Sequence, residues 1–220
     1  MRKPALTFVG GAGTVTGSKY LLDTGDSRVL IDCGLFQGLS SLRRKNWQPP
    51  PFTWTDLDAV VLTHAHLDHC GYLPLLVRHG WQGPVYATAG TAQLAEIVLA
   101  DSAHLLEEEA GHATRSGWSK HHPALPLYDR HDAARASRLL TVVPSGQSIS
   151  IANGLRLRFG RAGHILGSSW AELTVSTDDV QRSLLTSGDL GRAAHALAAR
   201  LHNEADWLAV VPKEGERVLL

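Results

Sequence analysis

The chain has 220 residues, 44% of them hydrophobic and 19% charged, which suits one sizeable α/β domain and leaves room only for a small second one. Its 21 Lys and Arg residues balance 21 Asp and Glu residues, which excludes a global attraction to nucleic acid or an anionic membrane. We find no apolar run long enough to span a membrane and no signal-peptide core. Two cysteines, Cys33 and Cys70, are too few for a disulfide framework, so we expect reduced core thiols in a cytoplasmic protein.

The first sixty residues favour strands. Short apolar runs predict them at 6–9, 19–23 and 28–32, the last two joined by a tight hairpin at 24–26. The glycine-rich stretch 10–17 is typical of a dinucleotide-binding loop, but that loop leads into a helix and a hairpin follows here, so we reject it. Residues 35–54 are polar, with Arg43-Arg44-Lys45 and three consecutive prolines, and predict a loop.

Strands and helices then alternate. Strands are expected at 58–62, 84–88, 155–159, 170–176 and 183–186. Helices are expected at 71–79, at 91 to about 113 from its apolar spacing, and near 132–140. A helix over 193–204 and a hairpin pairing 207–211 with 216–220 complete the prediction. This order indicates a layered α/β domain.

Four side chains of metal-ligand type follow the strand at 58–62. They are His64, His66, Asp68 and His69. Imidazole nitrogen and carboxylate oxygen suit zinc and related divalent ions. Their spacing fits no single helix face, but it fits a loop in which alternate residues meet at one point and the next pair at a second. A solvated polar loop is the alternative, and four such residues in six disfavour it, so we predict a metal site.

A catalytic metal site needs ligands from several segments of the chain, and two downstream segments offer them. His164 lies in a glycine-flanked turn between strands, and Asp189 follows an apolar strand and is bracketed by glycines. Each residue alone is typical of an ordinary turn. Together with the four ligand-type residues above, they provide a complete set of candidates.

The order His64-x-His66-x-Asp68-His69, then His164, then Asp189 resembles the metallo-β-lactamase superfamily, and within it the β-CASP group of RNA- and DNA-processing nucleases. Further motifs support the resemblance, at 10–18, 30–38, 126–128, 162–167 and 187–192. The resemblance covers residues 1–192 and implies an αββα sandwich. Residues 193–220 resemble the C-terminal helix and hairpin of the same family, packing on the same domain.

The resemblance also implies roles. His64, His66 and His164 would hold one zinc ion, Asp68 and His69 would hold a second, and Asp189 would bridge them. A bridging hydroxide would then hydrolyse an RNA phosphodiester, with Asp68 accepting a proton.

Other residues would assist. Asp32 would orient a ligand, although a strand-end turn explains it equally well from the sequence alone. Phe36 and residues 43–45 would guide nucleic acid, although a solvent-exposed loop is the favoured interpretation of 43–45.

The resemblance fails after Arg192, where the inserted β-CASP domain and its later catalytic histidine have no counterpart. We therefore expect an internal deletion with a seam near 193–195, and a sandwich incomplete in its second half. His195 and His202 are interpreted as ordinary surface residues. Missing strands would expose sheet edges and favour a homodimer. Two alternatives to a ribonuclease follow: a metal-binding but catalytically silent interaction module, or a hydrolase of small esters or lactams.

Overall fold

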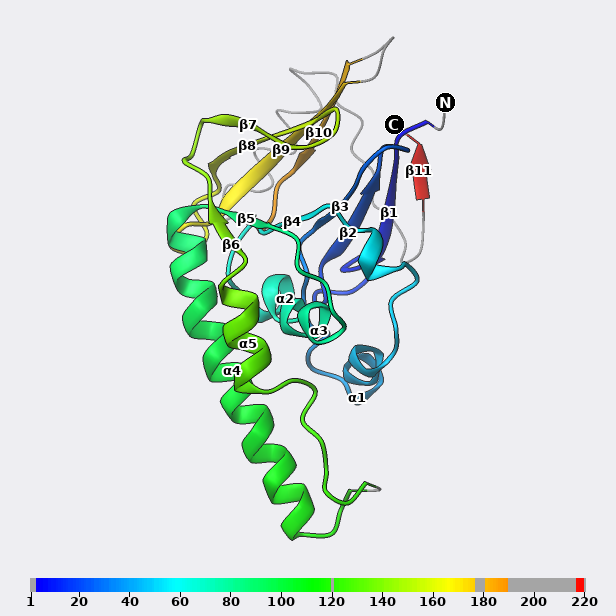
Figure 1. Cartoon of the computed structure of the whole chain (residues 1–220), viewed down its shortest axis with the longest axis vertical. Coiled ribbons are helices and arrows are strands. Elements are labelled where there is room, and N and C mark those ends of the chain that lie inside the picture. The colour runs from blue at the N-terminus through cyan, green and yellow to red at the C-terminus, as the bar shows by residue number, and fades with distance from the viewer. Residues whose placement is uncertain (1–2, 120, 177–180, 190–216, 220) are drawn as a thin grey trace.

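The computed structural model describes residues 3–119, 121–176, 181–189 and 217–219, which form two stacked β-sheets with helices against one of them (Figure 1). The larger sheet has the order β11-β1-β2-β3-β4-β5-β6. Its strands are β1 (Ala5–Gly10), β2 (Lys19–Asp23), β3 (Arg28–Ile31), β4 (Ala59–Val61), β5 (Val85–Ala87), β6 (Leu140–Val142) and β11 (Arg217–Leu219). β1 to β3 pair antiparallel and β3 to β6 pair parallel, which gives a mixed sheet.

The smaller sheet is antiparallel throughout, in the order β10-β9-β8-β7. Its strands are β7 (Ser148–Ala152), β8 (Leu155–Arg161), β9 (Ser169–Ser176) and β10 (Gln181–Thr186). Along β8, buried Leu155, Leu157 and Phe159 alternate with exposed Arg156 and Arg158. This period of two gives the sheet one apolar face, and that face must be covered.

Side chains alternate between the two faces of the larger sheet, so the same strands contribute to two hydrophobic cores. Val29 and Ile31 on β3 face the smaller sheet, together with Val61 on β4. Leu30 on β3 and Val60 on β4 face the helices instead. Strands buried on both faces read as continuous apolar runs, as the segment before His64 does.

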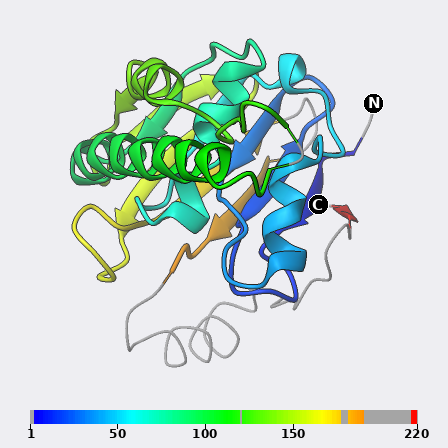
Figure 2. The same cartoon turned by 90° about the horizontal axis from the view of Figure 1, so that it is seen from below.

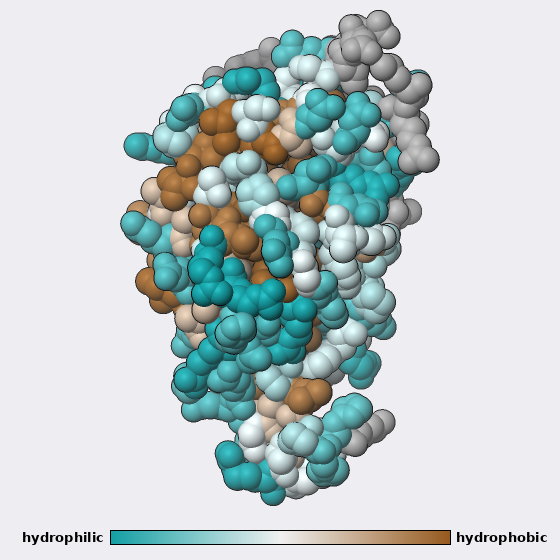
Figure 3. All heavy atoms as spheres, in the orientation of Figure 1, coloured by the Kyte–Doolittle hydropathy of each residue, from teal (hydrophilic) through white to brown (hydrophobic). Residues whose placement is uncertain are grey.

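The helices cover the outer face of the larger sheet. They are α1 (Ser40–Arg43), α2 (Leu67–Cys70), α3 (Leu73–Arg78), α4 (Ala89–Arg115) and α5 (Arg130–Ser137). Seen from below, α4 and α5 run side by side, and α4 extends beyond the sheets (Figures 1 and 2). Leu73, Leu76 and Leu99 are fully buried between helices and sheet, and each such side chain contributes about 1.5–3 kcal/mol by leaving water. On the face shown in Figure 3, hydrophilic side chains gather over α5.

Most predicted elements are confirmed, including the long helix, observed at Ala89–Arg115. The loop predicted at 35–54 is wrong, because it contains α1 and 3-10 helices at Arg44–Trp47 and Trp54–Asp56. These turns bury too few residues to leave an apolar period. The helix predicted at 71–79 is observed as α3, with α2 as a separate turn before it.

Two strands, β6 and β7, were missed by the sequence analysis. β11 lies within the predicted final hairpin and pairs antiparallel with β1. The predicted helix at 193–204, the strand at 207–211 and the seam near 193–195 lie outside the described residues. Among the helices that the structure does describe, none has both the length and the apolar character needed to cross a membrane.

Candidate metal centre

The candidate ligands come from four segments that end at one edge of the stacked sheets. Asp32 directly follows β3, and His64 lies three residues after the end of β4, its parallel neighbour. The carboxyl ends of parallel strands meet at one edge, so these side chains start close together. The turn between β8 and β9 brings His164 to this edge, and the end of β10 brings Asp189.

Four of these residues place their ligand atoms within 4.8 Å of one another: His64, His66, His164 and Asp189. The Nδ1 atom of His66 lies 3.0 Å from Nε2 of His64 and 3.2 Å from Nε2 of His164. The Oδ2 atom of Asp189 lies 3.9 Å and 3.7 Å from the same two nitrogens. Ligands of a tetrahedral zinc with bonds of roughly 2.0–2.1 Å lie about 3.3 Å apart, so this donor set fits such an ion.

A second pair of ligand-type side chains lies on the other side of Asp189. The Oδ1 atom of Asp189 is 3.3 Å from Nε2 of His69, and that nitrogen is 4.0 Å from Oδ2 of Asp68. The two carboxylate oxygens of Asp189 therefore face two different histidine groups. The structure brings all six predicted metal-site residues together at this edge, and their roles as metal ligands stay a prediction.

Asp32 is fully buried beneath the centre and accepts hydrogen bonds from several groups. Its Oδ2 accepts from Nδ1 of His69 at 2.7 Å, which directs Nε2 of that ring toward Asp189. Its Oδ1 accepts from the backbone N–H of Thr63 at 2.8 Å and from the Thr63 hydroxyl at 3.0 Å, and the Ser18 hydroxyl donates to Oδ2 at 3.3 Å. Asp32 is also the non-glycine residue with a positive φ, 56°, among the described residues. Such backbone strain persists where the surrounding contacts over-determine it.

Backbone hydrogen bonds and close backbone packing hold the segment that carries Asp68 and His69. The carbonyl of Asp68 accepts from Ser18 N at 2.8 Å, and the carbonyl of His69 accepts from Cys33 N at 2.7 Å. A Cβ atom on Gly34 would lie 1.6 Å from the Asp68 carbonyl oxygen, so only glycine allows this contact.

Burial and charge set the protonation of the centre. Burial, aided by the charge of His69, lowers the pKa of His64 to about 4, so this imidazole is neutral with a lone pair available. Burial acts in the same direction on His69, but the Asp32 carboxylate and hydrogen bonds with Asp189 and Asp32 outweigh it and raise its pKa to about 10. The hydrogen bond from His69 lowers the pKa of Asp189 to about 2.

These opposite shifts predict a stability maximum near pH 6.5 for metal-free protein. The raised pKa of His69 contributes stability below about pH 6.5, the unfolded value, and this is lost as the pH rises toward 10. The lowered pKa of His64 means that stability is lost as the pH falls from about 6.5 toward 4. Thermal unfolding in a chelator at several pH values measures both the loss of stability at alkaline pH (the alkaline limb) and the loss at acidic pH.

A His69→Gln variant should lose the alkaline limb, whereas His131→Gln, at an exposed position on α5, should keep it. An unchanged alkaline limb in the His69 variant would contradict the assignment.

The sequence analysis missed the polar residues that hold the ligand loops. Thr63 contacts Asp32 and places its hydroxyl 3.1 Å from Nδ1 of His64. The Ser168 hydroxyl accepts from the backbone N–H of His164 at 2.9 Å. Thr88 and Thr91 at the start of α4 donate to the carbonyl of Gly167 at 2.6 and 2.8 Å. Thr63 directly before His64 and Ser168 four residues after His164 were the available signals.

Other candidates lie elsewhere. Phe36 lies against the side chain of Lys45, and Arg43 and Arg44 are exposed on α1 and the following turn. Cys33 and Cys70 are confirmed as free, fully buried core residues.

A two-sheet α/β fold with histidines and aspartates converging at the sheet edge defines a metallohydrolase-type centre. The sequence profile described as "Metallo-beta-lactamase superfamily" matches residues 12–195. The chain therefore belongs to the metallo-β-lactamase superfamily, as the sequence analysis predicted.

Individual relatives are similar over most of this chain. A ribonuclease of Thermus thermophilus is 41% identical over 182 residues, which is 83% of this chain and 37% of the relative. Transcription termination factor FttA of Cenarchaeum symbiosum is 35% identical, over 84% of this chain and 27% of the relative. A subclass B3 metallo-β-lactamase with an active-site glutamic acid superposes with a TM-score of 0.48 and 22% identity, covering 90% of this chain and 67% of that chain. The chain spans well under half the length of the curated relatives.

Proposed function

We propose that the protein is a binuclear zinc hydrolase of the β-CASP type that cleaves RNA phosphodiester bonds. One observation carries this proposal: the two oxygens of Asp189 face two separate groups of histidines, at 3.7 Å from His164 and 3.3 Å from His69. A carboxylate shared in this way suits two ions at close range. Sequence similarity to a ribonuclease supports RNA as the substrate.

The chain's own residues would divide the work as follows. His64, His66 and His164 would hold one ion, Asp68 and His69 would hold the other, and Asp189 would join both. Zinc ions at these positions would supply a strong nucleophile at neutral pH and stabilise charge on the phosphoryl oxygens.

Asp32 would act on the centre through His69, fixing the ring and its tautomer, as carboxylates beside metal-bound imidazoles do. Because His69 is protonated in the metal-free protein, an ion entering its site must displace that proton. Asp68, whose Oδ2 lies 4.0 Å from Nε2 of His69, would accept a proton from water during the reaction.

A direct test uses the full chain and a fluorescently labelled single-stranded RNA. Cleavage should stop when zinc is removed with a chelator and should return when zinc is restored, with magnesium as the comparison ion. Cleavage that continues unchanged in the chelator would exclude this metal centre as its cause. Absence of cleavage in zinc-loaded, folded protein would contradict the proposed activity.

A further inference from the structure

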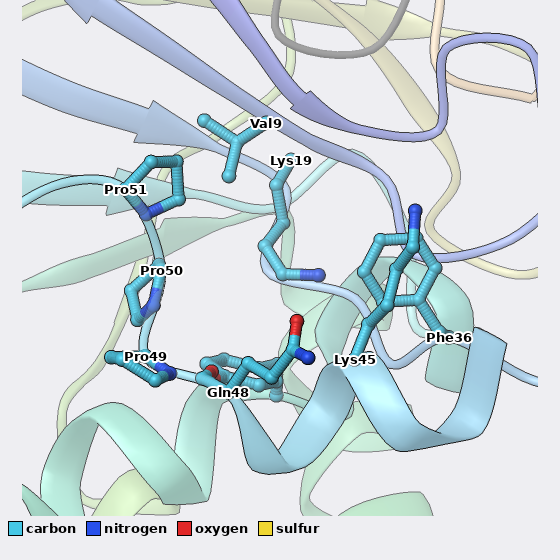
Figure 4. A pocket seen from close by; sticks show the side chains of 9 residues that line it. Val9, Lys19, Phe36, Lys45, Gln48, Pro49, Pro50 and Pro51 are labelled. Carbon is cyan, nitrogen blue, oxygen red and sulfur yellow. The ribbon is translucent and has the colours of Figure 1, made fainter. Parts of the chain in front are cut away.

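Two adjoining cavities lie on the helix side of the larger sheet, beside the 3-10 turn at Arg44–Trp47. The first has a volume of about 100 Å³ and is lined by Val9, Lys19, Phe36, Lys45, Tyr72 and residues 48–51 (Figure 4). The second, of about 270 Å³, is lined in part by Trp47, Trp54, Arg78 and His79. They share Gln48, Pro49 and Tyr72, so they form one groove, which we name the 36–54 groove.

The charged residues that line this groove are basic, and one of them, Arg78, is paired with Asp129 and Asp132. None of the described residues that line either cavity is acidic. The sequence has no Asp or Glu between Cys33 and Thr55, although it contains Arg43, Arg44 and Lys45 there. Arg43 and Arg44 are exposed and directly precede Lys45, which lines the groove. Because the chain as a whole is neutral, this local excess of positive charge is distinctive and complements a polyanion.

The groove is also aromatic. Trp47 is 63% exposed, an unusual position for so large an apolar ring. Trp54 stacks on His79 at 4.7 Å with an interplanar angle of 3°. Flat rings interleaved with cations are the features on which the bases and phosphates of single-stranded nucleic acid bind.

A buried cation connects the groove with the metal centre. The ammonium of Lys19 is 4.4 Å from the Phe36 ring and 4.9 Å from the Tyr72 ring, and points into the first cavity with the Gln48 amide (Figure 4). It donates to the carbonyl of Gly34, the residue packed against Asp68. Lys19 also directly follows Ser18, which contacts Asp32. Lys19, which lines the groove, is therefore linked to Asp68 through Gly34 and to Asp32 through Ser18.

We propose that the 36–54 groove binds a single-stranded segment of RNA outside the metal centre, with phosphates near Arg43, Arg44 and Lys45 and a base stacked on Trp47. This inference rests on the proposed function for the choice of RNA. The groove would hold a flanking part of the substrate and so favour unpaired RNA over a duplex, whose bases already stack on one another.

Binding of a short fluorescein-labelled oligouridylate to the full chain, followed by fluorescence anisotropy in a chelator, tests the groove without hydrolysis. Trp47→Ala should weaken binding by roughly five- to a hundredfold, and Trp47→Phe should restore most of it. The double change Arg43→Gln and Arg44→Gln should reduce the magnitude of the slope of log K against log salt by about 1.4. The matched controls Trp118→Ala, at a 78% exposed ring, and Arg182→Gln, at an exposed position on β10, should leave binding unchanged.

Equal affinities for the parent and the groove variants, or an equal loss in the Trp118 control, would overturn the inference. The outcomes also separate it from the proposed function. Groove-dependent RNA binding without zinc-dependent cleavage would support the groove and contradict the hydrolase. Zinc-dependent cleavage of bis(p-nitrophenyl) phosphate, together with equal RNA affinities of the parent and the groove variants, would overturn the RNA-binding role of the groove and leave the proposed hydrolase standing.

Discussion

Replacing Asp189 by alanine should reduce the zinc content from about two ions per chain to fewer than one, and lower RNA cleavage by at least about a hundredfold. The reason is geometric: each oxygen of this carboxylate faces a different histidine group, so its loss removes a ligand from both positions. About half of the side chain is exposed (47%), so its removal leaves no buried cavity and the fold should persist. Elemental analysis of the folded variant, followed by the cleavage assay, measures both effects.

Asp68→Ala provides the informative comparison, because Asp68 belongs to the same group as His69. This variant should lose about one ion and keep the position formed by the three other histidines. Asp101→Asn, at an exposed position on α4, is the matched control and should keep both ions and full activity. An Asp189→Ala protein that retains two ions would show that this carboxylate does not join the two positions.

Asp32→Ala should lower the free energy of unfolding by about 3–5 kcal/mol, because it leaves the cationic His69 buried without its main partner. The backbone N–H and hydroxyl of Thr63 lose an acceptor as well. Alanine also tolerates the positive φ of 56° less well than aspartate or asparagine. Chemical denaturation of metal-free protein measures this loss.

Asp32→Asn separates charge from shape at the same position. Asparagine accepts the left-handed backbone and keeps one oxygen acceptor, so it should cost about 1–3 kcal/mol. Loss of the negative charge should also lower the pKa of His69, which nuclear magnetic resonance titration of the imidazole would show. Zinc affinity should fall by about 10–100-fold even where the fold survives. An unchanged His69 titration would contradict the role given to Asp32.

Part of this molecule could be predicted because its signals are local. The buried strand before His64 is a continuous apolar run, and the long helix has a clear apolar period, so both were located within a few residues. The segment with α1 and its 3-10 turns was misread as a loop, since its short turns bury too little surface to leave a period. β6 and β7 were missed because short strands with exposed residues lack strong alternation.

The sequence by itself identified the side chains of the candidate metal centre, because four ligand-type residues lie within six positions and two more are bracketed by glycines. Only the tertiary structure shows how these side chains are arranged in two groups on either side of Asp189. From the sequence, Asp32 could be a turn residue or a residue that orients a metal ligand. The parallel pairing of β3 and β4 places its carboxylate 2.7 Å from Nδ1 of His69. The resemblance implied that Phe36 would guide nucleic acid, but the sequence did not indicate the groove that Phe36 forms with Trp47 and Lys19. Its residues come from separate segments, and only chain packing brings them together.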